Sequence, residues 1–436
     1  MRIVRICRAV TPGRPEGGAA RRRRRPLLGT FFLVNAVLTA VSGCAGTPPG
    51  GDAAAPRPAA VLHVPGEYPT VQAAADSARP GDLVLVRPGV YREGVTLRTP
   101  RVVLRGTDRQ GVVIDGEFRR ANGITVTGAG SAVENLTVRH HLANGLLFTG
   151  VTDERLQQRG AGGSGYDPLD TVKYPPLQGF RASYVTADAN ALYGIYAFDA
   201  HAGVIEHSYA SGQADSGIYV GQCRPCDTVV RQNEVSHNAV GIEVTNASES
   251  LWFLGNRIVG NRVGMTLNSN DVEALAPQHG AVVAGNVIRD NNDPDSPEQA
   301  DGGFGIGLGI GGGTGNLVTR NLITGNAAAG LLVTDVQGHP ADGNRLAGNA
   351  LSGNGADGVL TALARTGNCF SARPDGPCTP VADRPAAVTA PPGRSFRTLP
   401  PAPARPGSAD PETAPPIAAV GLPGPVPADD YPLPDS

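Results

Sequence analysis

The sequence has few of the residues that fill helical cores or bind copper. Its 436 residues include only 2 Met, 1 Trp and 8 scattered His, and charged residues make up 17%. Long amphipathic helices and a Met-rich or His-rich copper tract are therefore not expected. Glycine and proline are abundant instead, with 59 and 38 residues.

Basic residues are scarce outside the N-terminus. Residues 1–43 carry nine Arg and one Glu, which leaves 28 basic and 38 acidic residues in the rest of the chain. The remaining net charge is −10. Because nucleic-acid phosphates are bound by Lys and Arg, nucleic acid is not an expected partner.

A glycine returns every 23 or 24 residues in the middle of the chain. Gly194, Gly217, Gly241 and Gly264 each begin a short apolar stretch. A fixed period of this length is typical of a stacked-repeat fold, and it is too short and too rich in Gly, Asn and Val for a helical pair. The period predicts an all-β protein, a single-stranded right-handed parallel β-helix in which each repeat forms one coil.

The N-terminus has the pattern of a secretory signal peptide. Five consecutive Arg at 21–25 precede an apolar run at 27–41 and the sequence Ser-Gly-Cys44. The run is short for a membrane span, which needs about 20 residues. Cys44 after Ser-Gly resembles the lipobox of bacterial lipoproteins, which implies acylation of Cys44 and a lipid anchor on the extracytoplasmic face of the cell membrane. An ordinary cleaved signal is the alternative.

Composition divides the rest of the chain into three parts. Residues 44–60 are a small, Pro-rich tether, and 61–379 are assigned to the β-helix. A short helix at 70–78, with Thr70 as N-cap, is expected to cover the exposed first coil. Three polar excursions interrupt the period, at 151–178, 268–280 and 290–303. Residues 380–436 are rich in Pro and Ala, cannot bury a core, and are expected to be a disordered or extended tail.

The start of the β-helix resembles known secreted proteins of this fold. The segment YPTVQAAADSARPGD followed by PGVYRE is similar to pectin methylesterases and to the periplasmic, copper-accessory β-helix proteins of nitrous oxide reductase maturation. The resemblance implies the pectin-lyase-like fold. The downstream motifs of pectin methylesterases, the paired Asp of polygalacturonases and the Asp-Pro-His-Asp of alginate epimerases are not found, so it implies no particular activity.

Four cysteines outside the signal region form two close pairs, Cys223 with Cys226 and Cys369 with Cys378. Outside the cytoplasm such pairs favour disulfides. A redox Cys-x-x-Cys would need a βαβ context, and a four-ligand zinc site would need both pairs to meet across several coils. Two local disulfides are therefore predicted.

The outer face of one sheet is the candidate site. Strand residues alternate in direction, so Ile195, Ile218, Ile242 and Met265 should point inward. The next residues should point outward and stack in register: Tyr196, Tyr219, Glu243 and Thr266. Aromatic rings beside carboxylates suit sugar rings, although an aromatic ladder that stabilises the sheet is the alternative. The predicted substrate-binding residues are Tyr196, Tyr219 and Glu243.

Asparagine recurs at the expected turns, at Asn238, Asn261, Asn326 and Asn354. Asn tolerates the left-handed conformation, and stacked Asn side chains can hydrogen-bond from coil to coil. These residues are interpreted as structural ladders and not as ligands.

Carboxylates crowd the third excursion, at Asp290, Asp293, Asp295, Glu298 and Asp301. Oxygen ligands at short spacing could hold calcium, although the spacing is not that of an EF-hand and a solvated acidic loop is the alternative. We treat Asp290, Asp293, Asp295 and Asp301 as weak metal candidates. No other cofactor is expected.

Two functions from different classes fit these features. The first is a monomeric cell-surface protein that binds an extracellular polysaccharide or cell-wall component and meets the membrane only through its lipid anchor. The second is a polysaccharide lyase, hydrolase or epimerase, whose acid would be Glu243 or Asp215 and whose base would be His237 or Tyr219. Because no catalytic motif is complete, binding is favoured.

Overall fold

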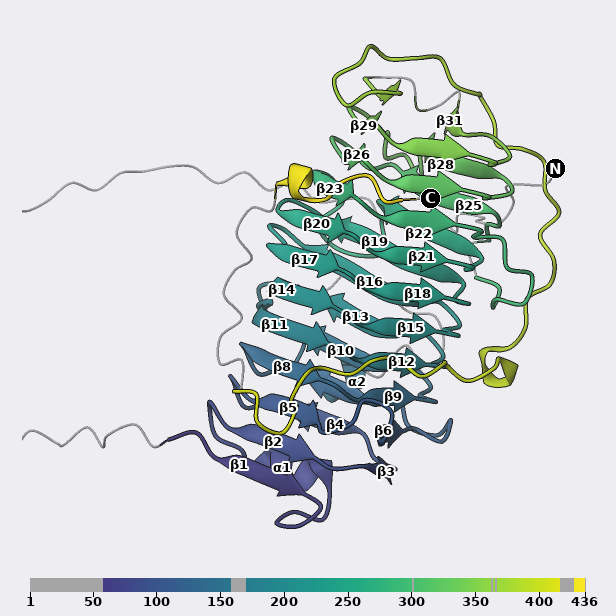
Figure 1. The fold of residues 1–436 in the computed structure, drawn as a ribbon. Helices are drawn as coiled ribbons and strands as arrows, with labels where there is room; N and C mark the ends of the chain where they lie inside the picture. Colours follow the sequence, from purple (N-terminus) through teal and green to yellow (C-terminus); the bar gives the residue numbers. More distant parts are fainter. Residues whose placement is uncertain are drawn as a thin grey trace, which may run out of the picture. The chain divides into compact units, whose positions relative to one another are not determined.

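The chain winds into coils, and each full coil contributes one strand to each of three parallel sheets (Figure 1). The computed structural model describes residues 58–157, 170–299, 302–361, 364, 367–415 and 427–435. Neighbouring strands within a sheet come from successive coils. The predicted all-β solenoid is therefore confirmed.

Sheet A has twelve strands in the order β1 (Val61–Val64), β2 (Leu83–Val86), β5 (Val103–Gly106), β8 (Ser131–Glu134), β11 (Leu177–Ser183), β14 (Ala200–Glu206), β17 (Thr228–Arg231), β20 (Leu251–Leu254), β23 (Ala281–Ala284), β26 (Leu317–Thr319), β29 (Arg345–Ala347) and β32 (Cys369–Ser371). Sheet B has ten: β3 (Gly89–Tyr91), β6 (Val112–Asp115), β9 (Thr137–Arg139), β12 (Thr186–Asp188), β15 (Tyr209–Ser211), β18 (Glu234–Ser236), β21 (Arg257–Val259), β24 (Val287–Arg289), β27 (Leu322–Thr324) and β30 (Ala350–Ser352). Sheet C also has ten: β4 (Val95–Leu97), β7 (Ile124–Val126), β10 (Leu146–Thr149), β13 (Ile195–Phe198), β16 (Ser216–Cys223), β19 (Val240–Ala247), β22 (Val263–Asn268), β25 (Ile306–Gly311), β28 (Ala329–Thr334) and β31 (Gly358–Leu360).

Helices are short in the described part of the chain. Helix α1 (Val71–Ser77) lies at the first coil, and the Thr70 side chain accepts a hydrogen bond from the Ala73 backbone N–H, as expected for an N-cap. The others are α2 (Glu154–Gln157) and the 3₁₀ turns η2 (Phe396–Thr398) and η3 (Ala428–Asp430). None of the described helices has the length and apolar character that a membrane span requires.

Asparagine amides stack in columns at the corners between sheets. At the corner before sheet C, Asn238 Nδ2 donates to Asn261 Oδ1 at 2.9 Å, and Asn261 Nδ2 donates to Asn291 Oδ1 at 3.0 Å. The column continues through Asn326 to Asn354. The ladder interpretation is confirmed, because each amide satisfies buried donors and acceptors of the coils beside it.

The conformational reason given for these asparagines is wrong. Positive φ falls on the residue before each ladder position, as at His237 (58°) and Gly260 (65°), and not on Asn238 or Asn261 themselves. The preceding residue therefore makes the turn, and the asparagine supplies the hydrogen bonds.

The repeated glycine lies against the same ladder. A Cβ at Gly217 would lie 2.7 Å from the Gly241 carbonyl oxygen and 2.8 Å from Asn238 Nδ2. A Cβ at Gly241 would lie 2.6 Å from the Gly264 carbonyl oxygen. The 23- or 24-residue glycine period thus arises because neighbouring coils approach closely beside the asparagine column.

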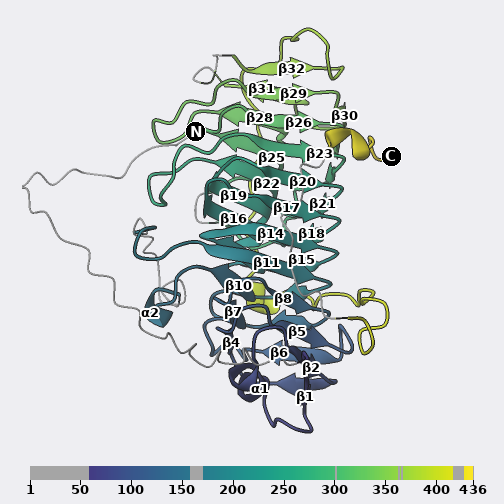
Figure 2. The same ribbon diagram turned by 90° about the vertical axis from the view of Figure 1, so that its left-hand side faces the viewer.

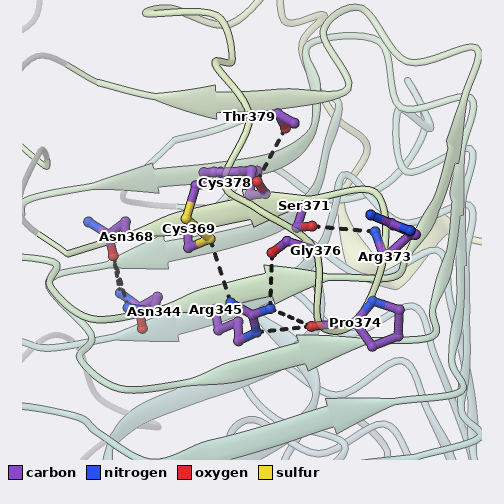
Figure 3. Close-up of a disulfide and its surroundings, with 11 residues drawn as sticks. Asn344, Arg345, Asn368, Cys369, Ser371, Arg373, Pro374, Gly376, Cys378 and Thr379 are labelled. Atoms are coloured by element: carbon purple, nitrogen blue, oxygen red, sulfur yellow. Dashed lines mark hydrogen bonds between the residues drawn. A yellow bond between two sulfur atoms is a disulfide. The ribbon is translucent and has the colours of Figure 1, made fainter.

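Both predicted disulfide pairs are joined in the structure, Cys223 to Cys226 and Cys369 to Cys378. The first closes the turn between β16 and β17. The second ties β32 to the loop that follows it, and Arg345 of β29 donates from Nε to the Pro374 carbonyl of that loop at 3.1 Å (Figure 3). The last coil is therefore tied both covalently and by an arginine from the coil before it.

The described tail residues, 380–415 and 427–435, lie mostly in extended form on the β-helix (Figures 1 and 2). Near the last coils Ala386 N–H donates to the Ala328 carbonyl at 2.9 Å. Near the first coils Ser408 N–H donates to Asn135 Oδ1 at 2.9 Å. The tail cannot build its own core, but its backbone finds partners on sheets A and B, at the corners and, through Ala382, on β31 at the end of sheet C.

Candidate functional site

The outer face of sheet C carries the predicted column in the predicted register. Tyr196 pairs with Tyr219, and Tyr219 pairs with Glu243, on three successive strands. Thr266 follows on β22. The residues predicted to point inward lie in the main core with no exposed surface: Ile195, Ile218, Ile242 and Met265.

The tyrosines of this column are covered, although they point outward. Tyr193, Tyr196 and Tyr219 form a cluster with ring centroids 4.5–4.9 Å apart, which we call the tyrosine cluster. Their exposed fractions are only 3%, 7% and 2%. The open aromatic column expected for sugar stacking is therefore not what the structure presents.

The loop that follows β22, residues 269–280, reaches the tyrosine cluster; we call it the 269–280 loop. The Tyr219 hydroxyl donates to Glu273 Oε1. A side chain at Gly221, the next outward position on β16, would overlap the Tyr219 ring and lie 3.0 Å from Glu273 Oε2. The glycine thus leaves the space in which the tyrosine and the carboxyl group meet.

Two side chains near the ends of β16 and β19 hold the 269–280 loop in place. Gln222 Oε1 accepts a hydrogen bond from the Ala274 N–H at 3.0 Å. Asn246 Nδ2 donates to the Glu273 carbonyl at 2.8 Å, and Asn246 Oδ1 accepts from the Asn270 N–H at 3.0 Å. Glu273 therefore reaches Tyr219 from a backbone fixed on both sides.

Burial changes the acidity of two carboxyl groups at this site. Desolvation raises the pKa of Glu273 to about 8, although the Tyr219 hydroxyl opposes the shift. Desolvation also raises the pKa of Asp199, beside Gln222 at the corner, to about 7. At neutral pH Glu273 is therefore mostly a neutral acid, the state that a general acid requires. Sequence reasoning missed Glu273 because it lies in an excursion with no period.

The structure brings two of the predicted catalytic candidates together. The Ser216 hydroxyl lies 3.1 Å from Asp215 Oδ1 and also hydrogen-bonds Glu243 Oε2. Asp215 and Glu243 are both partly exposed. Two carboxyl groups thus share one hydroxyl on the outer face, next to the tyrosine cluster.

His237, the third candidate, is engaged elsewhere. It lies in the turn before the asparagine ladder, and its Nδ1 is 2.8 Å from Asp293 Oδ2. That hydrogen bond raises the pKa of His237. The described contacts of His237 are thus with the third excursion, and the proposed pairing with Glu243 as acid and base finds no support in them.

The described candidate calcium ligands each contact a different basic side chain. Asp293 binds His237, Asp295 pairs with Arg394 at 2.9 Å, and Asp290 lies 3.8 Å from Arg289. Asp301 lies outside the described residues. Within the described ranges, no three His, Cys, Asp or Glu side chains gather in a way that could hold a metal ion.

A small open pocket, absent from the sequence predictions, lies on the same face at β4 and β7. Its volume is about 190 Å³, and its polar lining includes Thr96, Thr125, Arg120, Asn122 and Glu154. Asn122 Nδ2 donates to the carbonyl of Gln157 in α2 at 3.1 Å, which fixes one wall. Sequence reasoning could not find it, because its walls come from a corner and an excursion.

The pocket and the tyrosine cluster lie along one line. Thr96 pairs with Thr125, Thr125 with Leu147, and Leu147 with Tyr196 on consecutive strands of sheet C. The candidate site is therefore a strip of sheet C. It starts at the polar pocket, passes the tyrosine cluster and ends at the carboxyl pair Asp215 and Glu243.

A model of the family described as "Right handed beta helix region" matches residues 122–275 and 176–351, more than half of the chain. The chain belongs to this right-handed β-helix family. A search of curated proteins finds no match.

Solved structures are similar in fold to this member of the right-handed β-helix family. The mannuronan C-5 epimerase AlgE6 A-module of Azotobacter vinelandii is 15% identical with a TM-score of 0.48, covering 74% of this chain and 94% of that one. The Dettilon tailspike protein is 14% identical (TM-score 0.44; 71% and 66% covered). The alginate lyase of Paenibacillus sp. str. FPU-7 is 16% identical (TM-score 0.31; 72% and 98% covered). These similarities carry no conclusion about activity.

Proposed function

We propose that the protein binds an extracellular polysaccharide along the outer face of sheet C. The observation that carries the proposal is the polar pocket at β4 and β7, in line with the tyrosine cluster and the carboxyl pair. Its hydroxyl, amide, guanidinium and carboxylate groups can donate to and accept from the hydroxyls of one sugar unit. The partly exposed Asp215 and Glu243 lie further along the same strip.

The path of the tail supports the choice of sheet C. Ala382 pairs with Val359 of β31, at the end of sheet C, and so extends that sheet at its edge. Further along the described tail, contacts lie on sheets A and B and at the corners, as at Arg105, Tyr209 and Asp295. The proposal is drawn from these residues and not from the epimerase, tailspike and lyase of the same fold, although those names fit it.

The test is retention of the full-length protein on a panel of immobilised polysaccharides. Thr96→Leu fills the pocket with an apolar side chain and should abolish retention on the cognate polysaccharide. Thr324→Leu makes the same change at a partly exposed position on sheet B and should retain it. No retention on any polysaccharide, or equal retention of both variants, would contradict the proposal.

Catalysis is the second candidate, and the carboxyl groups favour it. Asp215 and Glu243 share the Ser216 hydroxyl, and burial raises the pKa of Glu273 to about 8. An acid and a base in one strip could support lyase, hydrolase or epimerase chemistry. In that case the wild-type protein releases new reducing or unsaturated ends, or changes the sugar configuration, and Glu243→Gln stops this. Pure binding leaves the polysaccharide unchanged.

Attachment to the membrane is part of the same proposal. Cys44 and the preceding signal lie outside the described residues, so acylation of Cys44 and a location on the extracytoplasmic face stay predictions. An anchored protein would hold the sheet C strip near the cell surface.

A further inference from the structure

The tail binds to the β-helix through its backbone carbonyl groups. Arg105 of β5 donates from Nη1 to the Ala414 carbonyl at 2.6 Å and from Nη2 to the Pro415 carbonyl at 3.2 Å. Its Nε donates to Glu134 Oε2 at 2.8 Å, and the Arg105 side chain is only 3% exposed. A guanidinium carries five N–H donors in a fixed planar arrangement, so one arginine can hydrogen-bond two carbonyls of an extended chain.

A second buried arginine repeats this arrangement. Arg109 donates from Nη1 to the Pro406 carbonyl at 2.7 Å. It is held by Thr186 Oγ1 at 2.9 Å and by the Val185 carbonyl at 2.9 Å. Because both of these partners belong to the β-helix, Arg109 is oriented toward the tail by the scaffold and not by the tail itself.

Two residues of the tail, Arg405 and Gly407, make contacts that other residue types could not make. Arg405 of the tail donates to Glu234 Oε1 at 2.6 Å, and its guanidinium lies 4.1 Å from the centre of the Tyr209 ring. A Cβ at Gly407 would lie 2.6 Å from Asn135 Oδ1, which accepts the Ser408 N–H. The surface therefore selects an arginine, and two residues later a glycine, within a proline-rich chain.

We infer that the outer surfaces of sheets A and B form a binding site for an extended, proline-rich peptide, and that residues 401–415 of this chain are its resident ligand. We call the residues that form this site the tail track: Arg105, Arg109, Asn135, Tyr209 and Glu234. Proline-rich chains suit such a site, because they are extended before binding and leave their carbonyls unpaired. The tail track holds the peptide by its own chemistry and does not need the covalent link to the last coil.

The test cuts that link in the full-length protein. A specific protease site is inserted between Val388 and Thr389, among residues 387–390, which are all exposed. Both disulfides lie before the cut, so the C-terminal fragment is then held only by non-covalent contacts. We expect the fragment to stay with the β-helix through size-exclusion chromatography in native buffer. Loss of the fragment from the unmodified protein would overturn the inference.

Variants of the tail track identify the groups responsible. Arg105→Gln and Arg109→Gln should each speed loss of the fragment by about tenfold or more, the usual effect of losing a charged hydrogen bond. Arg87→Gln, at an exposed arginine of the first coils, should leave the rate unchanged. Equal rates for all three variants would contradict the inference.

Labelled peptides keep the test independent of how the arginine variants fold. The cut protein should exchange its fragment for an excess of a labelled peptide of residues 401–415, and the uncut protein should not, because its covalently attached tail returns to the tail track. A peptide with Gly407→Ala should bind about tenfold more weakly, because its Cβ meets Asn135. Equal uptake of both peptides, or uptake of neither, would count against a sequence-selective site.

Discussion

At the corner before sheet C, successive coils place an amide at the same position, as in Asn238, Asn261 and Asn291. On the outer face of the same sheet, the matching positions of successive coils carry Tyr219, then Glu243, then Thr266. The corner repeats because each amide must bond to the coil above and to the coil below. The outer face is free to vary, because its side chains are not part of that column.

The ladder positions and the outer-face positions of sheet C also differ in what their side chains can do. The ladder amides before Asn354 have their hydrogen-bonding groups paired and buried, so the most that they can do is hold coils together. The outer face collects a carboxyl group with a raised pKa, Glu273, and two carboxyl groups that share the Ser216 hydroxyl, Asp215 and Glu243. Regular positions are therefore expected to affect stability most, and irregular positions to affect pH dependence and ligand binding.

The largest expected effect comes from breaking the ladder. Asn261→Ala removes the bonds to Asn291 Oδ1, to the Val235 carbonyl and from Asn238. Because several buried groups lose their partners, the free energy of unfolding should fall by about 3 kcal/mol. Urea denaturation followed by circular dichroism measures this loss.

The matched control is Asn354→Ala at the end of the same ladder. Asn354 is partly exposed, so water can replace its bonds, and we expect a loss of about 1 kcal/mol. If both substitutions cost the same, the ladder is not what distinguishes the corner from the surface.

The periodic part of the molecule could be predicted from the sequence. The glycine spacing gave the coil, and alternation within each strand placed Tyr196, Tyr219 and Glu243 in their observed register. These predictions succeeded because a residue's direction in a strand depends only on its position along that strand.

The aperiodic part could not be predicted in this way. Tyr219 is buried partly because the 269–280 loop covers it. Glu273 of this loop lies 54 residues after Tyr219, and nothing near Tyr219 in the sequence points to it. The tail was expected to be disordered or extended because its composition cannot build a core. In the structure its described residues contact arginines and polar groups of the β-helix, which the composition of the tail does not reveal.

A smaller effect should appear in the pH dependence of stability. The folded pKa of Glu273 is about 8, above the usual value near 4.5, so folding favours its neutral form. The stability from this group is fully present below about pH 4.5 and is lost as pH rises toward 8. Each pKa unit corresponds to about 1.4 kcal/mol, but the 269–280 loop can open locally, so we expect a loss of about 2 kcal/mol.

Glu273→Gln tests this expectation, because a neutral amide cannot ionise. Its unfolding free energy should change less between pH 5 and pH 9 than that of the wild type. Asp199, with a folded pKa of about 7, contributes in the same direction and remains in both proteins. Parallel pH profiles for the two proteins would show that Glu273 is not buried as a neutral acid.

The smallest expected effect concerns the hydroxyl that links the sheet to the loop. Tyr219→Phe removes the donor to Glu273 Oε1, at a cost of about 1 kcal/mol. Because this hydrogen bond lowers the pKa of Glu273, its loss should move the pH midpoint of the stability change upward. Tyr209→Phe on sheet B loses a comparable hydrogen bond, 2.7 Å to Ser236 Oγ, but should leave that midpoint where it is. A midpoint shift in Tyr219→Phe alone would assign the acidity of the outer face to the contact between Tyr219 and Glu273, whereas equal shifts in both variants would mean that the midpoint follows overall stability.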